Sequence, residues 1–270
     1  IKAILINLSD EHKSILDNMM LTFCTAVRYS FKRILEEIRI NDLEKIVAGK
    51  YNLNIRQAKD AVESARQTIK SQKESVKMYY ENYRHKVLKI ENILKDDNKK
   101  LSDRKRNALT SKLDKRRRKM KYWKGFIDSN SIPPVVFGTK EMFLRRCKGL
   151  ITNQEWKDLR NNRVYSRGDK TKKGNPNLRV VINRAVKIQV PLYLPQKLSK
   201  KTGKINGINY RELFLNHLQT GEAYQVELIK KDNKYYARIT FELPKIVPIY
   251  TGHNGIIGID TNPDGFALTM

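Results

Sequence analysis

An acidic residue ends a short apolar run near the carboxyl end of the sequence. Residues 256–259 are mainly β-branched isoleucine and Asp260 follows them, which predicts a buried strand with a carboxylate at its end. Residues 262–265, Asn-Pro-Asp-Gly, predict a tight turn, because proline fixes φ and glycine accepts positive φ. Carboxylate oxygens are the ligands that Mg²⁺ prefers, and two such ions can clamp the attacking and leaving oxygens of a phosphodiester. Asp260 is therefore a candidate metal ligand, although an Asp beside a hairpin turn also commonly caps a backbone N–H.

The charge of the chain indicates a polyanionic partner. The 270 residues include 55 Lys and Arg against 28 Asp and Glu, a net charge of +27 with a pI near 10.0. Such self-repulsion is tolerated mainly where a partner such as nucleic acid neutralises it. A membrane surface is the weaker candidate, because the sequence has no apolar run long enough to span a bilayer and no secretory leader. A ribosomal-type or merely basic soluble protein remains the alternative.

The two cysteines, Cys24 and Cys147, are far apart, with no CxxC pair or histidine cluster near them. They predict neither a zinc site nor a disulfide framework, which fits a reducing cytosol, and Cys24 is expected in the core. We expect a cytoplasmic, nucleoid-associated protein.

Three long helices follow a short strand at residues 2–8. Apolar residues recur at steps of three and four from Leu16 to Ile38, behind an N-cap at Ser9 and two first-turn acids. A second apolar stripe runs from Ile55 to about Leu94, and a third helix starts at Ser102. The third helix is dense in cations and poor in acids at i,i+4, which favours a phosphate-tracking face over an ordinary solvated one. Its candidate contacts are Lys115, Arg116, Arg117, Arg118, Lys119 and Lys121.

The region after Pro133 and Pro134 is richer in strands. Short helices are expected at 139–146 and 153–161, a strand at 186–192, and a hairpin around the Asp232-Asn233 turn. Strands this short favour a small barrel over an open sheet. A loop at 160–175 mixes Arg, Asn, Tyr and Gly, which suits phosphate and base-edge contacts and does not fit a P-loop. Its candidate residues are Arg160, Arg163, Tyr165, Arg167, Lys170, Lys172, Lys173 and Asn175.

The order of strand, helical insert, basic barrel and Gly258-Ile259-Asp260 resembles the TnpB proteins and the type V CRISPR effector nucleases. The resemblance implies an α+β fold in which a wedge (oligonucleotide-binding-like) β-barrel is interrupted by a helical recognition domain and runs into an RNase H-like RuvC nuclease. The implied boundaries are 1–8 for the first barrel strand, 9–130 for the helical domain, 131–252 for the barrel and 253–270 for the start of RuvC. Asp260 matches the first of three catalytic acids.

The resemblance also implies the function. We expect an RNA-guided DNA endonuclease that binds a guide RNA, recognises a short flanking motif in double-stranded target DNA and cleaves it at a RuvC site with two Mg²⁺ ions. Candidates for reading the flanking motif are Tyr29, Arg33, Gln57 and Lys59. The alternatives are a nuclease-inactive, RNA-guided repressor and a plain structured-RNA-binding protein. A DNA-strand transposase is disfavoured, because the sequence has no His-hydrophobe-His pair.

The sequence departs from this family in one respect. The family continues with a Glu-bearing and an Asp-bearing RuvC segment and a CxxC zinc module, which would lie beyond residue 270 together with any Zn²⁺. One carboxylate cannot hold two Mg²⁺ ions, so we expect no cleavage by the 270 residues alone. Either the chain is the N-terminal part of a longer protein or the nuclease has been lost.

Overall fold

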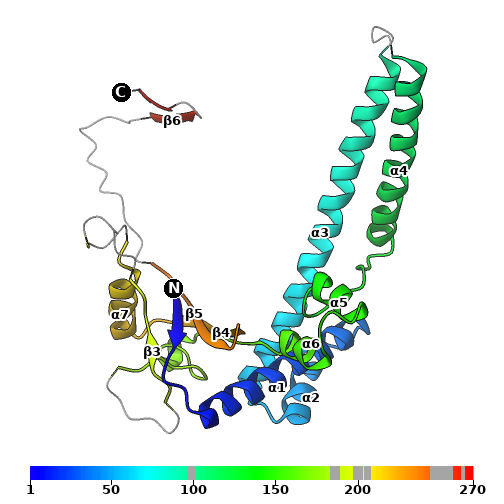
Figure 1. Cartoon of the computed structure of the whole chain (residues 1–270). Coiled ribbons are helices and arrows are strands. Elements are labelled where there is room, and N and C mark those ends of the chain that lie inside the picture. The colour runs from blue at the N-terminus through cyan, green and yellow to red at the C-terminus, as the bar shows by residue number, and fades with distance from the viewer. Residues whose placement is uncertain are drawn as a thin grey trace.

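The fold combines helices with an antiparallel sheet. The computed structural model describes residues 1–96, 101–182, 189–196, 203 and 208–243, and the backbone of 258–262 and 265–269. Over these ranges the chain forms seven α-helices and a five-stranded antiparallel sheet, which confirms the α+β class (Figure 1). Of the predicted strand at 186–192, residues 186–188 lie outside the described ranges, residues 189–191 are not in a strand, and Leu192 begins a two-residue strand.

Four helices occupy the first half of the chain. They are α1 (Asp10–Leu35), α2 (Ile40–Tyr51), α3 (Ile55–Lys95) and α4 (Asp103–Asp128). The predicted N-cap is confirmed, since the Ser9 side chain accepts a hydrogen bond from the His12 N–H at 3.1 Å. Helix α1 ends earlier than predicted, because Glu37 adopts a positive φ of 60°, and the unpredicted helix α2 follows. Helix α3 begins with a capping box in which Asn54 and Gln57 satisfy each other's backbone N–H.

Strands on both sides of these helices share one sheet. Its order is β2-β4-β5-β1-β3, so β1 at the amino end lies between two strands from the second half of the chain. The helical segment is thus an insertion between β1 and the other strands. The strands are β1 (Lys2–Leu5), β2 (Arg163–Ser166), β3 (Leu192–Tyr193), β4 (Tyr224–Lys231) and β5 (Lys234–Phe241). Over the described residues this sheet is open, so the closed barrel stays a prediction.

Two hairpins that the sequence predicted are present. Strands β4 and β5 meet at Asp232 and Asn233, whose φ values of 51° and 55° are those of a type I′ turn. The second hairpin pairs β6 (Gly258–Asn262) with β7 (Gly265–Thr269), and Asp260 stands opposite Ala267. The side chains of this hairpin and the turn at 263–264 lie outside the described part of the chain.

The short helices lie around the sheet and the base of the long ones. Helices α5 (Lys140–Cys147) and α6 (Asn153–Arg160) confirm the two predicted short helices and contact each other. Helix α7 (Tyr210–Thr220), which was not predicted, inserts Phe214 into the core, where its ring meets Tyr224 edge-on at 5.5 Å. A single 3₁₀ turn, η1 (Lys170–Lys172), lies in the loop after β2.

The main core joins the sheet to the base of the helices, and a second small cluster holds the end of the α3–α4 hairpin together. Residues from α1, α2, the start of α3 and the sheet form the main core. Cys24 is buried there as predicted, with its thiol 3.1 Å from the Arg163 carbonyl oxygen. The small cluster consists of Val87, Ile90 and Leu113. Because this cluster is narrow, α3 and α4 form an arm that projects from the body, with most of its surface in solvent (Figure 1).

Candidate nucleic-acid interface

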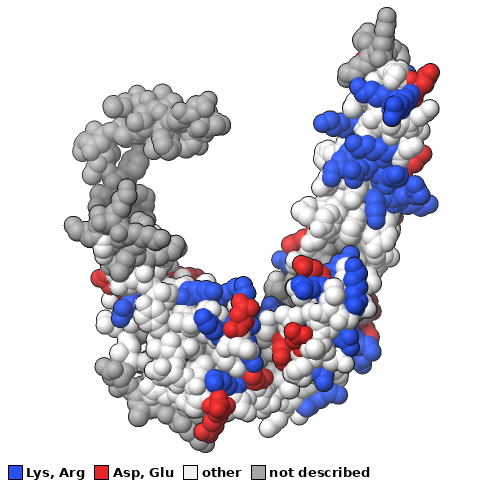
Figure 2. Space-filling model, viewed as in Figure 1, with Lys and Arg blue, Asp and Glu red and all other residues white. Residues whose placement is uncertain are grey.

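One face of α4 carries an excess of positive charge. The helix contains eleven Lys and Arg residues and three Asp residues. Lys112, Lys115, Arg116 and Lys119 follow one another at steps of three, one and three, so they lie along one side of the helix. Figure 2 shows Lys and Arg gathered on the outer half of the arm, with few acids among them. Like charges at these spacings destabilise an isolated helix, so the face favours an anionic partner.

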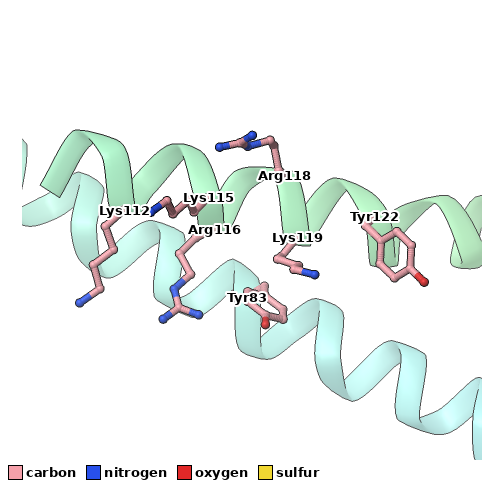
Figure 3. A pocket seen from close by; sticks show the side chains of 7 residues that line it. All are labelled: Tyr83, Lys112, Lys115, Arg116, Arg118, Lys119 and Tyr122. Carbon is pink, nitrogen blue, oxygen red and sulfur yellow. The ribbon is translucent and has the colours of Figure 1, made fainter. Parts of the chain in front are cut away.

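These cations surround a hollow between α4 and α3. The hollow has a volume of about 630 Å³ (Figure 3). Two tyrosines lie among the cations, Tyr83 from α3 and Tyr122 from α4. We call the seven lining residues the arm cluster: Tyr83, Lys112, Lys115, Arg116, Arg118, Lys119 and Tyr122.

The cations of the arm cluster are not neutralised by the protein. Of the six sequence-predicted cations on α4, Arg117 is the one with an acidic partner among the described residues, Glu91, at 2.7 Å. The five cations of the arm cluster and Lys121 form no ion pair within the described residues. Arg116 lies 5.7 Å from the Tyr83 ring centre and Lys119 lies 5.8 Å from that of Tyr122. The local field is therefore available to phosphate groups.

A second hollow lies between α3 and the edge strand β2. It measures about 610 Å³, and three of its lining residues are sequence candidates from the 160–175 loop: Arg163, Tyr165 and Arg167. Helix α3 contributes the amides Gln67 and Gln72. Amide and guanidinium groups are the side chains that read base edges in pairs of hydrogen bonds. Two carboxylates also line the hollow, Glu63 and Glu227, so it is less cationic than the arm cluster.

A buried carboxylate on α3 holds Arg167 in this second hollow. Asp60 is 0% exposed and accepts two hydrogen bonds from Arg167, from the backbone N–H at 3.1 Å and from Nε at 2.6 Å. Burial raises the pKa of Asp60, while the hydrogen bonds and charge of Arg167 act against that shift. The pair joins the base of the arm to the loop after β2. Sequence reasoning missed it, since Asp60 lies in an otherwise apolar stripe.

The rest of that loop is held by internal contacts. Asn175 is 0% exposed, donates to the Ser166 and Tyr224 carbonyls at 2.9 and 3.3 Å, and accepts from the Ser166 hydroxyl at 3.0 Å. Lys170 pairs with Glu222 at 2.9 Å. Both residues, which the sequence predicted as nucleic-acid contacts, thus have partners within the protein; Asn175 is buried, whereas the Lys170 side chain is 76% exposed.

The chain passes so close to β4 that a side chain at Gly168 would not fit. A Cβ there would lie 2.5 Å from the Tyr224 backbone nitrogen. Asp169 contacts Arg56 of α3, which ties the loop to the arm a second time. Lys172 and Lys173 of the same loop are exposed, so these two candidates are accessible to a partner.

Arg160, the first candidate of the loop, is partly buried at the end of α6. Its guanidinium lies 5.7 Å from the Trp156 ring centre, and its carbonyl accepts a hydrogen bond from Arg28 at 2.8 Å. These contacts hold α6 against α1.

The four candidates for reading a flanking motif do not form one surface. Tyr29 and Arg33 lie together, with the guanidinium carbon 5.4 Å from the ring centre. Gln57 instead caps α3, where its side chain accepts from the Asn54 N–H at 3.1 Å. Lys59 faces α2 and lies 3.7 Å from Glu44. The structure thus brings one pair together and gives the other two local partners.

The described residues do not complete a metal site. No group of three or more His, Cys, Asp or Glu side chains within them is placed to hold a metal ion. Asp260 lies in the middle of β6, but its side chain is outside the described part of the chain. One carboxylate does not fit a two-metal centre, so these residues alone support no cleavage step.

A family model matches most of the chain. The family model described as SSO2105 N-terminal domain matches residues 1–255. Neither a curated protein nor a solved structure matches the chain. Within the described ranges, none of the helices is both long and apolar enough to cross a bilayer.

Proposed function

The chain belongs to the SSO2105 N-terminal domain family, and we propose that it binds a structured guide RNA as part of an RNA-guided DNA endonuclease. In this proposal β1 and residues 131–252 form the wedge barrel, residues 9–130 form the recognition domain, and 253–270 begin a RuvC domain. Asp260 is then one ligand of a Mg²⁺ pair whose other ligands lie beyond this sequence. The observation that carries the proposal is the arm cluster.

The arm cluster favours RNA for electrostatic reasons. Five cations without ion-pair partners among the described residues line one hollow. Their positive potential is therefore concentrated at one place and is not offset by acidic side chains there. Phosphate neutralisation releases condensed counterions and supplies most of the binding free energy of such a surface. An acidic partner is needed to offset the repulsion between cations at i,i+3 and i,i+4 along α4.

The hollow between α3 and β2 is the better candidate for reading a flanking DNA motif. It offers Gln67, Gln72 and Arg163 at one place, whereas the four sequence candidates are dispersed. The Asp60–Arg167 pair fixes one wall of this hollow, which limits the side-chain entropy that the protein loses when base edges bind. We therefore move the proposed reading surface from Tyr29, Arg33, Gln57 and Lys59 to this hollow.

The test is capture of RNA from an expression host that carries the native locus. The chain is purified at moderate salt, and the bound RNA is sequenced beside RNA bound by a variant in which the five arm-cluster cations are Gln. We expect one discrete RNA from the locus with the wild type and its loss with the variant. Recovery of bulk ribosomal RNA alone by both proteins would instead support a plain RNA-binding protein.

A further inference from the structure

The arm cluster combines charge with aromatic rings that are partly exposed to solvent. The small buried cluster makes part of the α3–α4 contact, and Trp123 of α4 stacks on Tyr79 of α3 at 4.8 Å. Tyr122 meets Trp123 and Phe126 edge-on at 5.1 Å but is 50% exposed, and Tyr83 is partly exposed on the facing helix. Each of the two cluster tyrosines also has a cation of the cluster within about 6 Å of its ring centre, so rings and charges share one surface.

The rings and the cations occupy the same hollow. Figure 3 shows Arg116 and Lys119 extending from α4 beside Tyr83, with Tyr122 further along the same helix. Arg116 and Lys86 lie 5.7 and 5.4 Å from the Tyr83 ring centre, both longer than a close stacked contact. The rings are therefore loosely covered by flexible side chains that can move aside for a flat ligand.

Intact duplex and unpaired nucleotides would use this hollow differently. A duplex presents phosphates, which the cations can contact, but its base faces are stacked inside the helix. An unpaired nucleotide presents a base face as well as its phosphate, and an aromatic ring binds such a face whatever the base. Arginine can add a second planar surface over the same base.

We infer that the arm cluster is a stacking site for an unpaired nucleotide, such as a bulge or loop of a structured RNA. Tyr83 and Tyr122 supply the aromatic surfaces, Arg116 covers the base, and Lys112, Lys115 and Arg118 hold the flanking phosphates. This inference rests on the proposed RNA binding and adds which part of the RNA the arm recognises.

The experiment compares two RNA hairpins that are identical except for one 2-aminopurine, placed either in a single-nucleotide bulge or in the paired stem. Affinity is measured by anisotropy and stacking by fluorescence quenching, on the chain and on three variants. The double Tyr83→Leu, Tyr122→Leu variant removes the rings and keeps apolar bulk. The double Phe variant keeps the rings. The Lys115→Gln, Arg118→Gln variant removes two charges from the same hollow.

We expect the wild type to bind the bulged hairpin about 5-fold or more tightly than the paired one, and to quench the bulged base. The Leu variant should lose both effects, the Phe variant should keep them, and the charge variant should weaken binding to the two hairpins equally. Equal affinity of the wild type for both hairpins, or a Leu variant that still prefers the bulge, would overturn the stacking site while leaving RNA binding intact. Failure to bind either hairpin would overturn the proposed function together with it.

Discussion

The arm cluster sets a specific salt dependence for RNA binding. Each phosphate neutralised contributes roughly 0.7 to 0.9 to the slope of log K against log salt concentration. Five cations without ion-pair partners among the described residues line the hollow. If each contacts one phosphate, the cluster accounts for about 3.5 to 4.5 of the total slope. Replacing all five with Gln should remove that amount and leave the contribution of other contacts.

The fold should survive this change. The five side chains form like-charged pairs at i,i+3 and i,i+4, each of which destabilises a helix by about 0.2–0.5 kcal/mol. Neutralising them should therefore hold or raise the melting temperature, which circular dichroism can check. A loss of binding without a loss of helix signal then reports the interface alone.

A matched control separates position from net charge. It changes five exposed cations of the same types away from the hollow to Gln: Lys13, Arg39, Lys45, Arg145 and Lys148. The assay is fluorescence anisotropy with one structured RNA at several salt concentrations. The control should keep most of the slope. Equal losses of slope in both variants would refute a localised phosphate site and leave only a general effect of charge.

Three other predictions follow from the same structure. Asp60→Ala should lower the free energy of unfolding by about 2–4 kcal/mol, because it removes both hydrogen bonds that Arg167 donates to the Asp60 side chain, and a loss below about 0.5 kcal/mol in urea unfolding would contradict the anchor role. Burial raises the pKa of Asp60, so ionising this side chain costs stability, and the free energy of unfolding should fall as the pH rises from the unfolded-state pKa to the folded-state pKa. Asp60→Asn should remove this part of the pH dependence of stability, and an unchanged profile would count against it. Gln67→Ala or Arg163→Ala should each relax preference at one base of a flanking motif by about 1–3 kcal/mol in a motif-depletion assay, while Tyr29→Ala should leave the preference unchanged. A changed preference with Tyr29→Ala and none with the other two variants would place the reading surface on α1.

Local sequence signals predicted most of the elements, because each is set within a few residues. The apolar spacing from Leu16 onward gave the first helix, and Asp232-Asn233 gave the hairpin turn through its tolerance of positive φ. Two helices were missed although signals for both were present. In α7, Asn209 caps the first turn and Gly221 ends the helix with φ of 70°. In α2, Leu43 and Val47 stand four apart and both are buried.

The parts of the site that the sequence could not predict depend on contacts between distant residues. Asp60 and Arg167 are separated by 107 positions, and nothing local indicates that an acid within an apolar stripe is paired. From the sequence alone, Asn175 looked like a base-reading amide. Its burial depends on packing against Tyr224 of a later strand, which no local pattern reveals. Four of the cations predicted on α4 line the hollow, but Tyr83 comes from the facing helix and its place beside them became visible only in three dimensions.

The proposed nuclease activity has its own test at Asp260. In the protein expressed from its full reading frame, Asp260→Asn should abolish DNA cleavage and leave RNA binding unchanged, because Asn caps a turn almost as well as Asp but lacks the charge that holds Mg²⁺. Cleavage by this variant at the wild-type rate would show that Asp260 is a turn residue and would favour a nuclease-inactive, RNA-guided protein.

The central claim is that a bound RNA directs this protein to DNA, and reprogramming that RNA tests it most directly. The protein from the full reading frame is purified with its RNA, the candidate guide segment is replaced by an unrelated sequence, and binding to a library of duplex targets is measured with Mg²⁺ chelated. We predict that the bound DNA changes to match the new guide sequence and keeps the same flanking motif. Binding to the same DNA with either guide, or to no DNA with both, would contradict the claim.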